Sequence, residues 1–333
     1  MKLSIIIVNY KSSKLVFNCL QSIFKFNTDD FEFIVVDNFS NDDIEQLLSV
    51  NFPNVHFIQM GYNAGFARAN NAGINISNGE NILLLNSDTL IENDAINEVL
   101  ALFNKSEYVA CGVQLLNEDR SAQIAGNYAM KGGLNYLLPL PYLGDIIKSM
   151  GTLFKVNKPN VPNADDLVEV DWINGAFLMV KKKIINQSGL LDEDFFLYAE
   201  EAEWCSRIKK HGKLCIFGQC KVIHLQGETA NKAFSSIGKG YFNLSDKKGQ
   251  QIMLSNFVRI RKEFGVGWFL FDLLFYFFEI PVFLIGYLLE KILFLSKSRY
   301  TFIQIVGFVK NVGVLFYHTP KIISNKPFFY KVL

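Results

Sequence analysis

Short apolar runs that end in polar residues alternate with helical patterns through the first hundred residues of the chain. The patterns predict, in order, a strand over 3–8, a helix over 15–24, strands over 31–36 and 55–60, a helix over 66–76 and a strand over 82–85. Repeated strand–helix–strand units predict an α/β fold whose central sheet is mostly parallel. Because ligands bind at the carboxyl ends of parallel strands, the polar residues directly after each strand are candidates for a site.

The later part of the chain is less regular. Residues 122–166 are rich in Gly, Pro and Asn, which predicts a long connection that can cover a site. Order returns with an apolar run over 168–181, a helical segment over 195–210 and a strand over 221–225. The five cysteines form an odd set without a CxxC pair, which favours reduced thiols in a cytosolic compartment. The start, MKLSIIIVNYK, has too short an apolar run for a signal peptide and predicts a strand.

The last seventy residues differ in kind from the rest. Within residues 264–295, 24 of 32 side chains are hydrophobic, yet acids interrupt the run, so it lacks the roughly 18 uncharged residues of a simple membrane-spanning helix. Asp272, Glu279 and Glu290 fall on one narrow helical stripe, and Pro281 is expected to kink or break that helix. The wide apolar remainder predicts docking in the membrane interface or a shallow hairpin. The alternative is that these helices bury one another in a core or a dimer interface.

Net charge separates the two parts of the chain. The whole chain carries +1, which argues against a nucleic-acid partner. The first 263 residues carry −3, whereas residues 264–333 carry +4 and have no acid after Glu290. A basic tail after an apolar segment suits an anionic membrane surface on the cytoplasmic side. We therefore expect a catalytic domain over residues 1–263 and a helical membrane-docking region over residues 264–333.

Seven short motifs follow one another in the first 230 residues. In order they are SIIIVNY, VVDNFSND, GYNAGFARANNAG, LLLNSDT, DWINGAFLMVKK, GLLDEDFFLYAEEAEWCSRIKKHG and HLQGET. This series resembles the family 2 inverting glycosyltransferases, and within that family it is most similar to the rhamnosyltransferase-like branch. The resemblance implies the GT-A fold of nucleotide-diphospho-sugar transferases.

The resemblance implies a donor site near the first strands. Asp37 ends a buried strand and is implied to contact the nucleobase, with Tyr10 against the base or the ribose. In the following glycine- and asparagine-rich segment, a helix N-terminus near Gly65 can face an anion, and Arg68 offers a positive charge to a diphosphate. By the same resemblance Asn63 belongs to the nucleotide site.

A metal site is implied after the fourth strand. Asn86, Ser87 and Asp88 stand where the family has its DXD motif, in which carboxylates hold Mg²⁺ or Mn²⁺ against two phosphates. Asn86 replaces the first acid and is assigned to the donor site, which leaves Asp88 as the carboxylate ligand. His224 resembles the histidine of the family's HxxGxS element, which can complete the metal shell. A histidine at a strand end can also be an ordinary hydrogen-bonded residue.

Three acids, Glu200, Glu201 and Glu203, lie within four residues at a predicted helix start. They suit the helix dipole there, and Glu203 can pair with Arg207 one turn later. Clustered carboxylates also raise one another's pKa, which makes one of them a better proton acceptor near neutral pH. The family writes this element as Glu-Asp and uses the second residue as the base. The resemblance therefore implies Glu201 as the catalytic base, with Glu200 beside it.

Trp172, Asn174 and Gly175 precede a strongly predicted strand. An aromatic face can stack on a sugar ring and an asparagine can bond a hydroxyl, although Trp172 can also be an ordinary core residue. The resemblance implies that this turn lies beside the acceptor or the donor sugar.

The sequence thus predicts an inverting, metal-dependent glycosyltransferase that moves a sugar from dTDP-rhamnose or a UDP-hexose to a hydroxyl. The docking region favours a lipid-linked glycan as acceptor, at the cytoplasmic face of the cell membrane, during assembly of a cell-surface polysaccharide. One alternative is a sugar-nucleotide nucleotidyltransferase, whose glycine-rich first turn is missing from residues 9–14. Another is a non-catalytic membrane scaffold. The oligomeric state stays open, with a homo-oligomer among the alternatives.

Overall fold

The computed structural model describes residues 1–156, 159–225, 231, 233–236, 243–293 and 298–333, and it divides into two compact units. Unit 1 comprises residues 1–128, 160–196 and 200–229. Unit 2 comprises residues 129–159, 197–199 and 230–333. Within the predicted HLQGET motif, residues 226–229 lie outside the described part of the chain.

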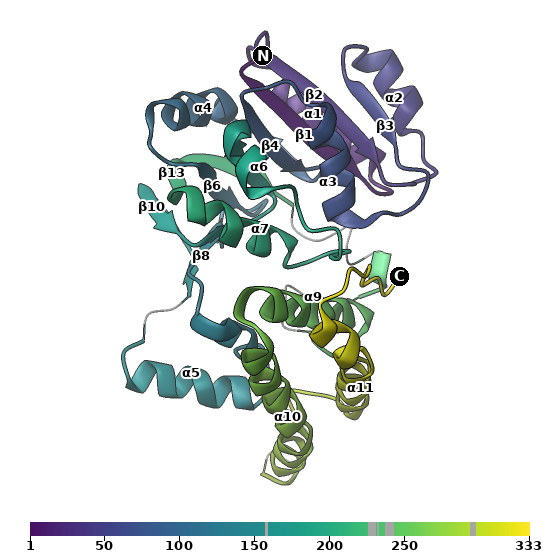
Figure 1. Ribbon diagram of the computed structural model, residues 1–333, viewed down its shortest axis with the longest axis vertical. Coiled ribbons are helices and arrows are strands. Elements are labelled where there is room, and N and C mark those ends of the chain that lie inside the picture. Colours follow the sequence, from purple (N-terminus) through teal and green to yellow (C-terminus); the bar gives the residue numbers. More distant parts are fainter. Residues whose placement is uncertain (157–158, 226–230, 232, 237–242, 294–297) are drawn as a thin grey trace. The chain divides into compact units, whose positions relative to one another are not determined.

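Unit 1 is an α/β unit built on one mixed sheet (Figure 1). Its elements in chain order are β1 (Leu3–Asn9), α1 (Ser13–Ile23), β2 (Phe31–Asp37), α2 (Ile44–Asn51), β3 (His56–Gln59), α3 (Gly65–Ile76), β4 (Asn81–Asn86), β5 (Thr89–Ile91), α4 (Ala95–Lys105), β6 (Ala110–Leu116), β7 (Ala122–Gln123), β8 (Gly126–Asn127), β9 (Asn160–Val161), β10 (Leu167–Val170), β11 (Trp172–Ile173), β12 (Phe177–Lys181), α6 (Lys182–Ser188), α7 (Glu200–Ile208), the 3-10 turn η2 (Lys209–His211) and β13 (Leu214–His224).

The main sheet has the strand order β10-β13-β6-β12-β4-β1-β2-β3. Strands β3, β2, β1 and β4 are parallel to one another, and β12 runs antiparallel between β4 and β6. The predicted α/β fold and its parallel start are confirmed, while the sheet as a whole is mixed. Asn9 at the end of β1 lies beside Asp37 of β2, and Val8 lies beside Asn86 of β4. Three polar strand ends therefore meet at one edge.

Burial explains why the first strands are continuous apolar runs. Every residue of β2 is buried, and β1 is buried except for the half-buried Val8, which is typical of parallel strands covered on both faces. All five cysteines are buried and free, and burial raises the pKa of Cys19 to about 12, which keeps that thiol protonated. A separate three-stranded sheet pairs β11, β8 and β9.

Unit 2 is helical in its described part. Its elements are the 3-10 segment η1 (Lys131–Leu137), α5 (Leu143–Leu153), α9 (Lys247–Phe264), α10 (Val266–Leu293) and α11 (Phe302–Ser324). The connection predicted over residues 122–166 is thus largely structured: it supplies short strands to unit 1, and η1 and α5 to unit 2. The expected division after residue 263 falls in the last turn of α9, inside unit 2, and stays a prediction about function.

Two of the three acids of α10 face the interior of unit 2. Asp272 and Glu279 are fully buried, and Glu279 accepts backbone hydrogen bonds from Tyr142 (3.1 Å) and Leu143 (3.0 Å) at the start of α5. Helix α10 continues through Pro281 for 28 residues, so the proline does not break it. The rings on either side of the proline, Tyr276 and Phe283, both pack on Phe308 of α11, which holds the two halves together.

The outer sides of the unit 2 helices are apolar. Helix α10 is the one described helix long and apolar enough to cross a membrane, judged by length and composition. Large apolar side chains are exposed on three helices: Leu270, Phe271, Leu274, Phe277, Phe278, Leu284, Ile285, Leu288, Leu289, Ile292 and Leu293 on α10; Phe302, Ile303, Val306, Val309, Phe316 and Tyr317 on α11; and Ile146, Met150 and Leu153 on α5.

Candidate active site

The ends of β1 and β2 are held together by buried hydrogen bonds. The Asp37 carboxylate, 1% exposed, accepts from the Asn9 amide (2.8 Å), the Gln59 amide (2.7 Å) and the Ser40 backbone N–H (3.1 Å). Tyr10 follows β1 directly and is half-buried. The predicted nucleobase contact of Asp37 would therefore start from a carboxylate that is already fixed in orientation.

Asn38 connects β2 to the glycine-rich segment. Its amide donates to the Asn63 side-chain oxygen (3.1 Å), and its own oxygen accepts from the Ala64 N–H (2.7 Å). Gly65 then begins α3 with a positive φ of 77°, and the Phe66 N–H donates to the Phe196 carbonyl (2.8 Å). Asn38 is not among the predicted site residues, although its place directly after a strand end is a usable signal.

Arg68 lies one turn into α3 and contacts the segment before α7. Its Nε donates to the Glu193 carbonyl (3.1 Å), and one terminal nitrogen lies 3.4 Å from the Tyr62 hydroxyl. The guanidinium is engaged by protein atoms in this conformation, and its predicted diphosphate contact stays a prediction.

The ends of β4 and β13 bring Asn86, Asp88 and His224 together. The His224 Nε2 lies 3.3 Å from the Asp88 Oδ1 and 3.4 Å from the Asn86 Nδ2. Antiparallel pairing of His224 with Thr89 accounts for this meeting of distant residues. All three side chains lie in unit 1 and are buried or half-buried.

Gln123 fixes the orientation of the His224 ring. The Gln123 Oε1 lies 2.9 Å from the His224 Nδ1, and its Nε2 donates to the His224 carbonyl (2.6 Å) and to the Asn117 side-chain oxygen (2.8 Å). These acceptors orient the amide so that its oxygen faces Nδ1. An Nδ1–H tautomer leaves the lone pair of Nε2 directed at Asp88. Gln123 lies in the irregular segment after residue 122 and carried no sequence signal.

The donor set at this edge fits a divalent cation that is shared with a substrate. The described residues contain no group of three or more His, Cys, Asp or Glu side chains placed to hold a metal. Asp88 and His224 are two ligands, and Mg²⁺ bound to nucleotides typically takes one or two protein carboxylates and completes its shell with phosphates and water. The hydrogen bond from His224 Nδ1 to an amide oxygen is the usual support of a metal-ligating histidine.

The turn before β12 lies against α7. A Cβ placed on Gly175 would lie 3.7 Å from the Cβ of Glu201, and the Asn174 side-chain oxygen accepts from the Ala176 N–H (2.9 Å). Trp172 is half-buried on β11 and pairs with Asn127 of β8. The turn thus places the two residues predicted to bind the sugar next to the predicted base.

The acid cluster on α7 separates into three environments. Glu200 is 3% exposed, its Oε2 has no hydrogen-bond partner among the described residues, and Glu203 pairs with Arg207 at 2.7 Å, as predicted from their spacing. Burial, and then the charge of Glu201, raise the pKa of Glu200 well above its usual range. Glu201 is half-buried and faces Gly175. Because Glu200 already holds a proton, Glu201 is the acid of this pair that can accept a proton.

Glu200→Gln should stabilise the fold, increasingly so at higher pH. The folded protein holds the Glu200 proton to a higher pH than the unfolded chain, whose pKa is about 4.3, so the wild type loses stability as pH rises above that value. The gain should approach about 1.4 kcal/mol for each pH unit until the folded-state pKa is reached. Urea unfolding from pH 4 to pH 8 measures it. Glu45→Gln on exposed α2 is the control, and a gain independent of pH would contradict the prediction.

Hydrogen bonds and packing join these pieces within unit 1. The Ser12 and Ser87 hydroxyls lie 3.3 Å apart, which links the end of β1 to the Asp88 turn. The Asn86 N–H donates to the Ala176 carbonyl (3.0 Å), which links that turn to the segment facing Glu201. One edge of the sheet thus gathers a carboxylate–histidine pair, an acid pair and a glycine-rich helix start. Such an arrangement can hold a cation against phosphates and accept a proton nearby.

Comparison with known proteins finds one matching family model and several relatives. Residues 4–157 match the model of glycosyl transferase family 2. The low-salt glycan biosynthesis hexosyltransferase Agl10 of Haloferax volcanii is 33% identical over 226 residues, which cover 66% of this chain and 65% of that protein. The dTDP-rhamnosyl transferase RfbF of Shigella flexneri is 25% identical over 60% of this chain and 61% of that protein. The rhamnosyltransferase WbbL of Escherichia coli is 24% identical over 62% of this chain and 77% of that protein.

Residues 4–157 thus match glycosyl transferase family 2, the relatives include rhamnosyltransferases, and the resemblance seen in the motifs is confirmed. The chain spans just under two thirds of the length of Agl10 and RfbF.

Proposed function

We propose that the chain is an inverting glycosyltransferase that moves a sugar from a nucleotide-sugar donor to a hydroxyl of a lipid-linked glycan. The observation that carries this proposal is the linked series from Glu201 through Gly175 and Asn86 to His224. It puts a half-buried acid and a carboxylate–histidine pair in one site. Transfer with inversion needs these two functions on opposite sides of the anomeric carbon.

Glu201 is the proposed catalytic base. It accepts the proton of the acceptor hydroxyl while the hydroxyl oxygen attacks the anomeric carbon and the bond to the nucleoside diphosphate breaks. Glu200, held protonated by its burial, adds no second negative charge beside the base. Trp172 and Asn174 lie on the turn next to Glu201 and are proposed to orient the sugars.

Asp88 and His224 are proposed to hold Mg²⁺ or Mn²⁺. The cation, when bound, neutralises negative charge on the departing diphosphate. Asp37, Tyr10, Asn63, Gly65, Arg68 and Asn86 are proposed to surround the nucleotide. The proposed donor is dTDP-rhamnose or a UDP-hexose: the name of RfbF supports dTDP-rhamnose, and the name of Agl10 supports transfer of a hexose.

Replacing Gln123 with Leu should weaken metal binding at Asp88 and His224. Without the amide oxygen at Nδ1, the ring loses its fixed orientation and tautomer, which typically costs about 10–100-fold in metal affinity. Titration of Mn²⁺ with a nucleoside diphosphate present, followed by electron paramagnetic resonance, measures binding directly. Gln123→Glu keeps an acceptor at Nδ1 and should bind more tightly than Gln123→Leu; equal affinities for the wild type and both variants would contradict the assignment.

A panel of sugar nucleotides tests the proposed reaction. Hydrolysis or transfer should depend on added Mg²⁺ or Mn²⁺, stop with a chelator, and favour one donor. Formation of a sugar nucleotide from a nucleoside triphosphate and a sugar phosphate would instead indicate a nucleotidyltransferase. A chain that binds no sugar nucleotide in a thermal-protection assay would support the scaffold alternative.

Membrane docking is proposed for the apolar surface of unit 2, at the cytoplasmic face of the cell membrane. The burial of Asp272 and Glu279 supports it, because two of the three acids of α10 are turned away from the exposed apolar side chains, and the third, Glu290, is paired with Arg299. The basic, acid-free sequence after Glu290 supports it as well. Docking would bring a lipid-linked acceptor to the enzyme.

Docking is best tested in the full chain. Removing residues after 263 would uncover Phe257 of α9, which packs on Phe269 and Tyr276 of α10. Phe277→Ser combined with Phe278→Ser changes two half-exposed rings of α10 and should reduce sedimentation with phospholipid vesicles. Val50→Ser on exposed α2 is the control, and a wild-type chain that never sediments with vesicles would refute docking.

A further inference from the structure

One face of α11 is exposed along the length of the helix. Phe302, Val306, Val309, Tyr317 and Ser324 follow at spacings that return to the same side of a helix, and all five are exposed. The opposite side is buried, where Phe308, Leu315 and Ile322 face the interior of unit 2. The exposed side therefore forms one continuous stripe from residue 302 to residue 324.

The first half of this stripe borders an apolar groove. The groove has a volume of about 440 Å³ and lies between α10 and α11. Helix α10 contributes Ile280, Pro281 and Leu284, and α11 contributes Phe302, Val306 and Val309. These lining side chains are uncharged and apolar, so a hydrocarbon chain is the kind of ligand that suits the groove.

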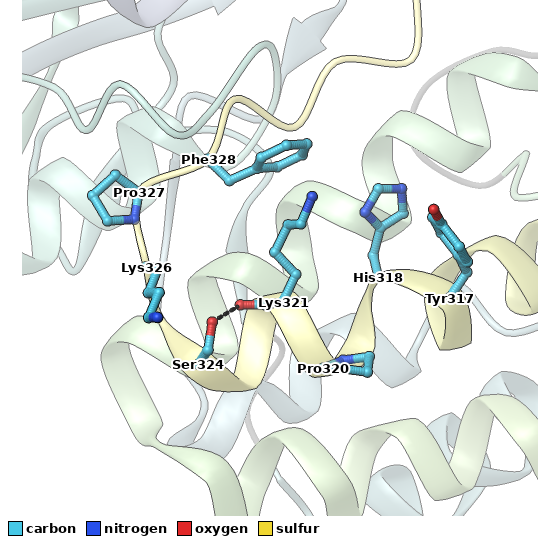
Figure 2. A pocket seen from close by; sticks show the side chains of 8 residues that line it. All are labelled: Tyr317, His318, Pro320, Lys321, Ser324, Lys326, Pro327 and Phe328. Atoms are coloured by element: carbon cyan, nitrogen blue, oxygen red, sulfur yellow. Dashed lines mark hydrogen bonds between the residues drawn. The ribbon is translucent and has the colours of Figure 1, made fainter.

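The second half of the stripe leads into a basic pocket. This pocket has a volume of about 610 Å³, and Tyr317, His318, Lys321, Lys326 and Phe328 are among the side chains that line it (Figure 2). Its lining contains two lysines and no acid. Figure 2 shows the ammonium of Lys321 directed at the space between the rings of Phe328 and His318, and this ammonium lies 3.5 Å from the centroid of the Phe328 ring.

Three polar groups of the pocket can form further ion pairs or hydrogen bonds. Within the described part of the chain, neither the Lys321 nor the Lys326 ammonium has an ion pair, and the buried Nδ1 of His318 has no hydrogen-bond partner. Burial, and then the charge of Lys321, lower the pKa of His318, so its ring is neutral at pH 7. A neutral imidazole can still donate one hydrogen bond. Two ammonium groups and one such donor suit a phosphate.

We propose that the groove and the pocket together bind one anionic phospholipid, with an acyl chain in the groove and the phosphate against Lys321 and His318. Val309 and Lys321 are twelve residues apart, which is about 18 Å along a helix and within the reach of one extended acyl chain. Tyr317, 81% exposed, lies between the two halves, where an amphipathic ring suits the boundary between hydrocarbon and water. The inference rests on the membrane docking proposed above and adds a specific lipid site to it.

Vesicle binding of the full chain tests the site. Phosphatidylcholine vesicles with and without phosphatidic acid are compared by sedimentation, using the wild type and the double variant Lys321→Gln/Lys326→Gln. The variant should lose about tenfold or more in partitioning onto the phosphatidic acid vesicles, and more than a variant that lacks two lysines elsewhere on the same surface, because direct contacts of ammonium groups with one phosphate add to the diffuse attraction of any lysine near an anionic surface. Its partitioning onto pure phosphatidylcholine should not change.

A charge-matched control separates a pocket from diffuse attraction. Lys291→Gln/Lys310→Gln removes two exposed lysines of α10 and α11 that do not line the pocket. Equal losses for the two double variants would overturn the proposal. His318→Phe keeps an aromatic ring beside Phe328. It should weaken binding to the vesicles that contain phosphatidic acid and leave binding to pure phosphatidylcholine vesicles unchanged.

Two further measurements distinguish a lipid phosphate from a free phosphate, and failure of the lipid site from failure of membrane docking. Val306→Asn should weaken binding to both kinds of vesicle, because it places a polar amide in the groove. Inorganic phosphate should not displace the wild type from phosphatidic acid vesicles at the same phosphate concentration; displacement would indicate a free-anion site and overturn the lipid assignment. Failure of the lipid site leaves binding to neutral vesicles intact, whereas failure of docking abolishes binding to every vesicle.

Discussion

Replacing Glu201 with Gln should lower the rate of sugar transfer by about 10²–10⁴-fold, which is the usual contribution of a general base. The amide is similar in size to the carboxylate but cannot accept the proton of the attacking hydroxyl. Nucleotide-sugar binding, followed by thermal protection or calorimetry, should stay within about twofold of wild type, because Glu201 is assigned to the acceptor side of the reaction. Single-turnover kinetics with saturating donor measures the chemical step.

The surface variant Glu45→Gln is the matched control for this experiment, since it removes one exposed carboxylate from α2. It should leave both transfer and donor binding unchanged. Full turnover in Glu201→Gln would reject this residue as the base. Loss of donor binding together with turnover would show that Glu201 acts in the ground state and not in proton transfer.

Gly65→Ala should destabilise the fold by about 3–5 kcal/mol, a size reached when a substitution collides with the backbone. A Cβ at this position would lie 2.3 Å from the Phe196 carbonyl oxygen, and the positive φ of Gly65 is itself unfavourable for alanine. The collision would separate the start of α3 from the segment before α7. Donor binding should fall with it, because this helix start lies in the proposed nucleotide site. Urea unfolding measures the loss of stability.

Gly61→Ala separates backbone strain from collision. Gly61 has nearly the same φ, +74° against +77°, but a Cβ there would meet nothing within 4 Å. Its cost should stay near about 1–2 kcal/mol, the penalty of a left-handed alanine alone. Equal losses of stability for the two variants would show that the Phe196 contact contributes little.

Much of unit 1 follows from local sequence. Fully buried parallel strands leave continuous apolar runs, and polar residues follow the runs because the carboxyl ends of the strands are where turns and ligand sites form. This is why β1, β2, β3 and β4 were predicted nearly to their ends, and why polar residues after them, such as Asn86 and Asp88, were candidates for a site. The pairing of Glu203 with Arg207 was equally predictable, because it depends only on helical spacing.

The missed features depend on distant partners. Gln123 orients His224 from 101 residues away, and its own neighbourhood shows no periodic pattern. Residues 122–166 looked like a loop because η1 packs against α9 and α10, which follow more than 100 residues later, and because the acid that caps α5 is Glu279. Gly132 illustrates this: a Cβ there would lie 2.1 Å from the ring of Trp268, a contact that no local pattern can announce.

The cap that Glu279 provides for α5 has a consequence for biosynthesis. Helix α5 ends at Leu153, whereas the described helices it belongs with, α9 to α11, extend to Ser324. At about 5–20 residues per second, ribosomes need roughly 10–30 s to make the intervening chain. During that interval the start of α5 lacks the hydrogen bonds that Glu279 later accepts from it. Unit 2 can therefore complete its fold only after α10 and α11 have been synthesised.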